Sequence, residues 1–132
     1  MKKMFFVLIS LIFICWCSWW DKWEYVIEDE AIEILSVVKV QAKYEDTQWF
    51  PSSFLKAYDE CYEEATNNKE KNPLIMCMHI ALNINAWMCI AARDSSEESK
   101  ELEEIAYSKY CWLMIDGADK LNQKIAYYDY KF

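Results

Sequence analysis

Residues 74–92 constrain the fold more than any other segment, because they contain no charged side chain and are apolar on nearly all sides of a helix. A helix with this pattern is stable in water when other helices surround it. The run is also long enough to cross a bilayer, although His79, Asn83 and Asn85 would be costly in lipid. We therefore predict the central helix of a bundle, with a membrane span as the alternative.

The composition also favours helices. The 132 residues include one glycine and two prolines, and 55% are hydrophobic, which argues against both disorder and a turn-rich β fold. The length fits one domain with a single modest core. We predict an all-α fold, in which a small disulfide-stabilised bundle of four to five helices over residues 21–132 follows an N-terminal hydrophobic leader or anchor helix over residues 1–20.

Apolar residues at spacings of three and four predict where the helices lie. We expect helices over residues 21–44, 53–67, 74–92, 95–116 and 118–128. The first should bury Trp23, Ile27, Ala31, Ile34, Leu35, Val38 and Ala42. Within this segment the β-branched stretch 34–40 leaves a short strand as the alternative.

The helix expected over residues 95–116 has a start and a stop signal. Ser95 and Glu98 have the spacing of a capping box, with Ser95 as the N-cap. Gly117 is well placed as the residue that ends the helix. Between these signals, the residues expected to face the core are Leu102, Ile105, Ala106, Lys109, Trp112 and Leu113.

The N-terminus has the pattern of an export signal, because Lys2 and Lys3 precede an uninterrupted apolar run over residues 4–14. Cys15 and Cys17 are a poor cleavage pair, and neither follows the small residue that usually precedes a lipid-bearing cysteine. A cleaved signal, a lipoprotein and an uncleaved anchor therefore all stay open. Export in any of these forms predicts a periplasmic protein, or one at the outer face of an inner membrane.

Four tryptophans favour the uncleaved anchor. Trp16, Trp19, Trp20 and Trp23 share one helical stripe. Indoles prefer the interface between membrane and water, so we predict that these four residues form an interfacial collar.

The cysteines outside the leader are Cys61, Cys77, Cys89 and Cys111, and an even number in a small exported chain predicts two disulfides. Cys77 and Cys89 lie on one predicted helix about 18 Å apart, so they cannot bond to each other. A helical hairpin turning near residue 70 would place Cys61 level with Cys77. We prefer Cys61–Cys77 with Cys89–Cys111, although the second bond needs a bend in the fourth helix. A free, buried Cys89 is the alternative.

The chain is acidic, with a formal net charge of −8 and a pI near 4.7. Nucleic acids and anionic lipids are therefore poor partners for the folded part, whereas a basic protein is a favourable one. Most acidic runs are simply solvated helix faces. Here we also consider an acidic docking surface, which would comprise Glu28, Asp29, Glu30, Glu33, Glu97, Glu98, Glu101 and Glu104.

No pattern in the sequence predicts a catalytic, metal or cofactor site. His79 is the only histidine, and no spacing typical of zinc or di-iron ligands, phosphate loops or serine nucleophiles is present. His79, Asn83 and Trp87 form a line along the 74–92 helix, which we interpret as an internal hydrogen-bond ladder.

Export, disulfides, negative charge and the lack of catalytic groups together predict a binding protein. The leading hypothesis is a small exported protein that inhibits or neutralises a basic enzyme or toxin in the periplasm, in the manner of lysozyme inhibitors or immunity proteins. The alternative is a membrane-anchored accessory subunit of a secretion, conjugation or exclusion apparatus.

Overall fold

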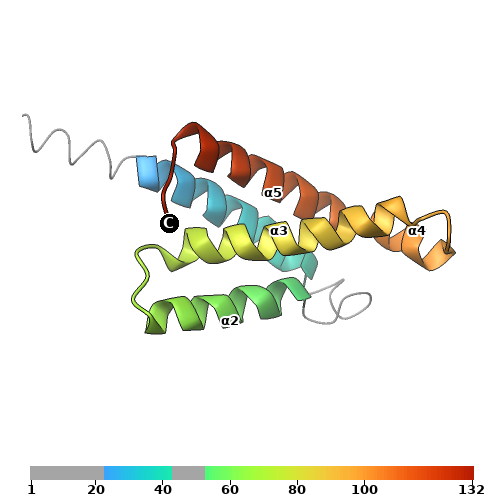
Figure 1. The fold of residues 1–132 in the computed structure, drawn as a ribbon, viewed down its shortest axis with the longest axis horizontal. Coiled ribbons are helices and arrows are strands. Elements are labelled where there is room, and N and C mark those ends of the chain that lie inside the picture. Colours follow the sequence, from blue (N-terminus) through green and yellow to red (C-terminus); the bar gives the residue numbers. More distant parts are fainter. Residues whose placement is uncertain (1–22, 43–52) are drawn as a thin grey trace, which may run out of the picture.

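The computed structural model describes residues 23–42 and 53–132, so the predicted leader lies outside the described residues. The described residues form helices and no strands (Figure 1). The elements are a helix over residues 23–42, termed the N-terminal helix, then α2 (Ser53–Asn67), α3 (Pro73–Asp94), α4 (Lys100–Ala106) and α5 (Lys109–Tyr127). This confirms the predicted helical bundle, and residues 34–40 are helical instead of forming a strand.

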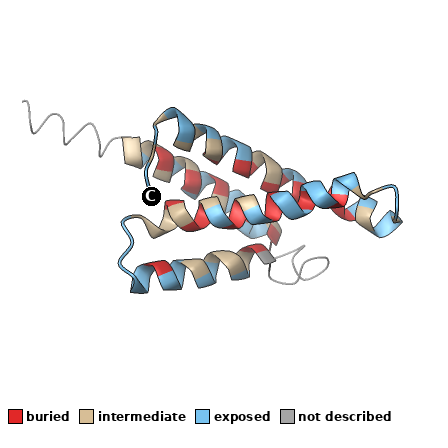
Figure 2. Cartoon of the chain, viewed as in Figure 1, coloured by how far each residue is buried: buried red, intermediate tan, exposed pale blue. Residues whose placement is uncertain are grey.

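α3 is the central helix, as the uncharged run predicts, and it contacts α2, α4 and α5. It begins where Asn72 accepts a hydrogen bond from the backbone N–H of Ile75 at 3.1 Å, with Pro73 in the first turn. Figure 2 shows buried residues concentrated on the inward faces of the helices. On α3 this face comprises Ile75, Cys77, Met78, Ala81, Leu82, Asn85, Ala86, Cys89 and Ala92.

The N-terminal helix buries the face that its sequence pattern predicts. Ile27, Ala31, Ile34, Val38 and Ala42 are all buried, at spacings of three and four that keep them on one side of the helix. The helix lies beside α5 and behind α3 in Figure 1. Its apolar face thus closes the core against the two longest helices of the C-terminal part.

Both preferred disulfides form. Cys61 bonds to Cys77 across the α2–α3 hairpin, with their Cα atoms 5.6 Å apart. Lys69 supports the intervening turn in a left-handed conformation, with a φ of 56°. Cys89 bonds to Cys111, with a Cα separation of 5.4 Å. The alternative of a free Cys89 is therefore wrong.

The second disulfide is possible because the helix predicted over residues 95–116 is broken. α4 ends at Ala106, and α5 begins anew at Lys109 behind Ser108, whose hydroxyl accepts a hydrogen bond from the backbone N–H of Cys111 at 3.2 Å. This break is the bend that the Cys89–Cys111 bond requires, and it re-orients every residue that follows it.

The break also changes which residues face the core. Tyr110 and Met114 are buried, whereas Lys109 and Trp112, both expected inside, are exposed. The hydroxyl of Tyr110 donates a hydrogen bond to the buried side-chain oxygen of Asn85 at 3.1 Å. This bond matters because an unpaired amide in the core would be strongly destabilising.

The predicted capping box is also wrong. Ser95 caps the C-terminus of α3, where its backbone N–H donates to the carbonyl of Ala91. Glu98 lies in the turn that follows, and Ser99 is the residue that precedes α4. α3 continues past the uncharged run and includes Arg93 and Asp94, because neither residue interrupts the backbone hydrogen bonding of the helix.

Gly117 lies inside α5 and does not end a helix, contrary to the prediction. A Cβ atom at this position would lie 2.9 Å from Cγ2 of Ile34 and 3.3 Å from Cδ2 of Leu82. The lack of a side chain therefore lets α5 approach the N-terminal helix and α3 closely. The helices predicted on either side of Gly117 are consequently one helix.

Candidate protein-docking groove

A groove runs along the surface between the N-terminal helix and α5. One hollow in it has a volume of about 200 Å³. The hollow, termed the acidic groove, is lined by Glu30, Glu33, Ile34, Val37, Val38, Trp112, Leu113, Asp116, Gly117 and Lys120. Two features noted above create it, since Gly117 brings the two helices together and the break at Ser108 turns Trp112 outward.

The charged side chains of the acidic groove are three carboxylates, Glu30, Glu33 and Asp116, and one ammonium group, Lys120. Asp116 and Lys120 are paired at 2.9 Å. This hydrogen bond and the charge of Asp116 raise the pKa of Lys120, and Glu30 and Glu33 act in the same direction. Among the residues that line the groove, the negative charges therefore outnumber the positive charge by two.

The floor and one wall of the acidic groove are apolar. Ile34, Val38 and Leu113 are buried beneath it. Val37 is 50% exposed and Trp112 is 60% exposed. Tryptophan next to charged groups is typical of the residues that contribute most to protein–protein binding. A long basic side chain could lay its aliphatic stem on this floor while its cationic end meets the carboxylates.

The groove continues toward the C-terminal end of α5. A second hollow of about 430 Å³ shares Glu30 and Lys120 with the first. Its remaining lining consists of Gln123, Lys124, Tyr127 and Tyr128. Tyr127 is 81% exposed. Because Lys124 adds a positive charge here, negative charge is concentrated at the end near Trp112.

The structure divides the predicted acidic surface into two patches. Glu30 and Glu33 line the acidic groove, and Glu28 and Asp29 lie on the same helix. The other four residues are exposed in the turn after α3 and on α4, namely Glu97, Glu98, Glu101 and Glu104. α4 lies at the end of the bundle opposite the C-terminus (Figure 1). The eight residues therefore do not form one continuous docking surface.

Of the charged and aromatic residues of the groove, sequence reasoning missed three: Trp112, Asp116 and Lys120. The sequence pattern predicts Trp112 in the core, because it predicts a helix that runs unbroken through residues 107 and 108. The spacing of Asp116 and Lys120 by four residues does signal an exposed ion pair on a helix. It gives no indication that this pair faces Glu30 on another helix.

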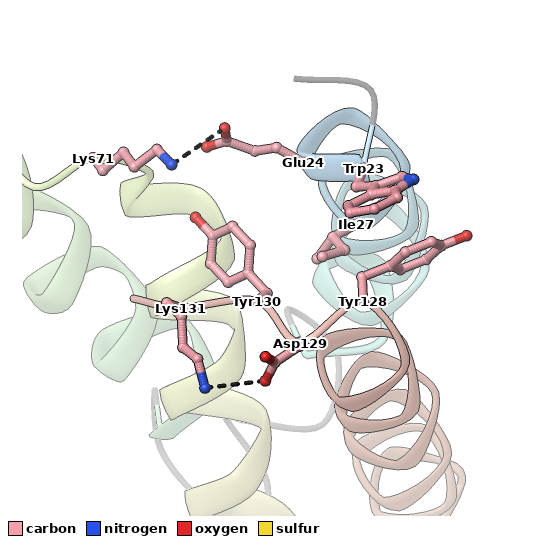
Figure 3. A pocket seen from close by; sticks show the side chains of 8 residues that line it. All are labelled: Trp23, Glu24, Ile27, Lys71, Tyr128, Asp129, Tyr130 and Lys131. Atoms are coloured by element: carbon pink, nitrogen blue, oxygen red, sulfur yellow. Dashed lines mark ion pairs between the residues drawn. The ribbon is translucent and has the colours of Figure 1, made fainter. Parts of the chain in front are cut away.

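A third, smaller hollow of about 110 Å³ lies where the C-terminal segment meets the N-terminal helix (Figure 3). Trp23 packs against Tyr128 at one wall, with ring centroids 6.1 Å apart. The structure thus places this member of the predicted membrane collar against the folded domain, while Trp16, Trp19 and Trp20 lie outside the described residues.

Glu24 contacts Lys71 and Asn72 at this third hollow. Its carboxylate lies 3.8 Å from Nζ of Lys71 and accepts a hydrogen bond from Nδ2 of Asn72 at 3.2 Å. Burial, followed by the charge of Glu24 and a hydrogen bond to it, raises the pKa of Tyr130 to about 12. Figure 3 shows Lys71 reaching toward Glu24. Because its charged groups already pair with one another, we interpret this hollow as a structural contact between the C-terminal segment and the N-terminal helix.

His79 and Asn83 belong to a partly buried hydrogen-bond network, which confirms this part of the predicted ladder. Nδ2 of Asn83 lies 3.1 Å from Nδ1 of His79 and also donates to Oδ1 of Asn122, and Asn122 donates back to Asn83 at 2.9 Å. The His79 ring stacks on Phe132 with centroids 5.1 Å apart. Burial lowers the pKa of His79. The prediction that Trp87 belongs to this ladder is wrong, because its side chain is 79% exposed.

Within the described residues no group of three or more potential metal-ligating side chains comes together, and α3 is long and apolar enough to cross a membrane, by length and composition only. Of the most apolar 18-residue stretch of α3, 44% is buried within the bundle. Comparison with known protein families, with curated proteins and with solved structures found no match.

Proposed function

We propose that this protein is a small acidic binding protein that captures a basic protein partner in the acidic groove. The observation that carries the proposal is the combination of Glu30, Glu33 and Asp116 with the exposed indole of Trp112 over an apolar floor. Carboxylates that surround an apolar anchor attract a basic partner over a distance and then fix its orientation.

The partner that fits this chemistry presents an arginine or lysine beside an apolar residue. An arginine is the better match, because its planar guanidinium pairs with two carboxylate oxygens and stacks on an indole. We propose that the partner is a basic enzyme or toxin, and that occupation of the groove inhibits or neutralises it. This function requires no catalytic group in the binding protein.

The site of action we propose is the periplasm or the outer face of an inner membrane. Two disulfides indicate an oxidising environment, because reducing compartments keep cysteines as thiols. The export pattern of residues 1–20 supports the same location.

The test is affinity capture from an envelope extract with the full, detergent-solubilised chain as bait. We expect a basic protein to bind at low salt and to be released as the ionic strength rises, because screening weakens exposed charge pairs. The groove variant Glu30→Gln/Glu33→Gln/Asp116→Asn should lose this capture.

The chain offers a matched control for that variant. Glu97→Gln/Glu98→Gln/Glu101→Gln also removes three negative charges, but at the other end of the bundle. It should bind the partner as the wild type does. If the two variants lose binding equally, net charge and not the groove governs capture, and the proposed site is wrong. A captured enzyme that keeps full activity when saturated with the protein would refute the inhibitory role.

A further inference from the structure

α3 carries an exposed apolar face on the side away from its buried residues. The large side chains of this face are Ile80 (39% exposed), Ile84 (50%), Trp87 (79%), Met88 (36%) and Ile90 (43%). Ala91 is exposed among them. No charged residue interrupts the face, since the uncharged run extends over residues 74–92. Single exposed apolar residues are ordinary, but a continuous stripe along a helix marks an interaction surface.

We propose that this face is a homodimer interface whose occupant is α3 of a second copy of the chain. Ile80, Ile84, Trp87 and Ala91 follow one another at intervals of four, three and four residues. This is the spacing with which two helices pack side by side along an apolar seam. No other element in the described residues occupies the seam.

The face also has a projecting side chain next to a shallow depression, and a twofold interface can use both. In such an interface the same patch of both subunits must supply the projection and the recess. Trp87 projects from the surface, and beside it lies a shallow, open apolar depression on α3 lined by Asn83, Ile84, Trp87, Met88 and Ala91. The small side chain of Ala91 keeps this depression open.

An antiparallel arrangement of the two copies fits the helix dipoles. The charged residues of α3, Arg93 and Asp94, both lie at its C-terminal end. Antiparallel packing keeps these ends apart and places the positive end of each helix dipole beside the negative end of the other. Parallel packing would bring like ends together. The midpoint of the seam falls between Ile84 and Trp87, so each indole would face the depression of the other copy.

The exposed area fits a weak dimer. At roughly 200 Å² for each large side chain, the exposed fractions amount to on the order of 500 Å² per chain. Two copies would then bury on the order of 1,000 Å², which is the lower limit for a specific interface. The net charge of −8 opposes association at low salt, so the dimer should strengthen as salt screens the repulsion.

This salt dependence separates the dimer from the proposed partner binding, which weakens with salt. The two proposals use different faces, so either can fail without the other. A lipid surface is the competing occupant of the α3 face. The α3 face is only as wide as one helix, and the adjacent helix α2 carries the acidic residues Asp59, Glu60, Glu63 and Glu64. Both features disfavour a lipid surface as the occupant.

The first test is photocrosslinking in the full chain. A benzophenone amino acid in place of Trp87 should yield a crosslinked species of twice the 15.8 kDa chain mass, with the crosslink on residues of α3. The control is the same substitution at Trp112, which is 60% exposed but lies in the acidic groove. It should give no self-crosslink. Crosslinks from position 87 to lipid only, or to a different protein only, would overturn the proposal.

The second test is sedimentation of the full chain in mild detergent between about 1 and 100 μM, where a weak interface of this area should dissociate on dilution. Ile84→Ala/Trp87→Ala should weaken the dimer at least about tenfold, because it removes the central projection and its neighbour. Trp112→Ala should leave association unchanged. Circular dichroism checks that both variants remain folded. We expect them to fold because the substituted side chains are exposed. A monomer at all concentrations, or equal effects of the two variants, would refute the dimer.

Discussion

Gly117 provides the sharpest test of how the bundle is packed. Substituting alanine at an interior helical position normally stabilises a helix by about 1 kcal/mol relative to glycine. Here the added Cβ would lie 2.9 Å from Cγ2 of Ile34, inside the range of normal carbon contacts. Ile34 cannot easily rotate away, because one χ1 rotamer dominates for isoleucine in a helix. The N-terminal helix itself must therefore move.

We expect Gly117→Ala to destabilise the protein. Overpacking of this kind costs about 1 to 3 kcal/mol, and the gain in helix propensity is about 1 kcal/mol, so the net loss is about 0 to 2 kcal/mol, with a central value of about 1 kcal/mol. For a domain of this size such a loss lowers the midpoint of thermal unfolding by about 4 °C. Differential scanning calorimetry and urea denaturation with intact disulfides measure both quantities.

A double-mutant cycle identifies the contact responsible. Ile34→Ala alone should cost about 2 to 5 kcal/mol, because it removes a buried side chain. In that background Gly117→Ala has no Cγ2 to meet, so it should be neutral or stabilising. If Gly117→Ala stabilises the wild type by about 1 kcal/mol, the helices separate at negligible cost. The explanation of the glycine by close approach would then be wrong.

Three further predictions concern other contacts. Replacing Cys89 and Cys111 with serine should lower the free energy of unfolding by about 3 kcal/mol, because the bond closes a segment of 22 residues; urea titration measures this loss. The lowered pKa of His79 means that the unfolded state binds its proton first, so stability should fall as the pH drops below about 6.5, and fall less in His79→Asn; calorimetry at pH 7.5 and 5 tests this sign. The raised pKa of Tyr130 gives stability that is present below about pH 10 and lost toward pH 12. Because burial also raises the pKa of Tyr58 to about 12, the late step in the tyrosinate absorbance titration should lose about half of its amplitude in Tyr130→Phe.

The break between α4 and α5 has a consequence for the proposed function. Had residues 95–116 formed one helix, Trp112 would face the core, and the acidic groove would lack its exposed indole. Ser108 restarts the helix and fixes its first turn through the hydrogen bond to Cys111. The same bond positions Cys111 for the disulfide to Cys89. One cap thus links the stability of the core to the surface that we propose binds the partner.

The sequence predicts those parts of the fold whose signals lie within a single helix or between neighbouring helices. Helical periodicity was sufficient to predict the N-terminal helix, α2 and α3, because the positions of Ile27, Phe54 and Leu82 within their own helices already place them inside. The cysteine spacing and the helix rise together excluded one pairing and favoured the observed one. The acidic residues of the groove were predicted only in part, as members of a larger surface that the structure divides.

The sequence by itself determined that this chain is a helical bundle around an uncharged central helix with two disulfides, because periodicity, composition and cysteine spacing act over a few turns of one helix. Tertiary structure alone decided the role of Gly117, the outward position of Trp112 and the exposure of one face of α3. Each of these depends on how closely two or three helices approach and on which side they pack. Such contacts join residues far apart in the sequence, such as Ile34, Leu82 and Gly117, and no local pattern encodes them.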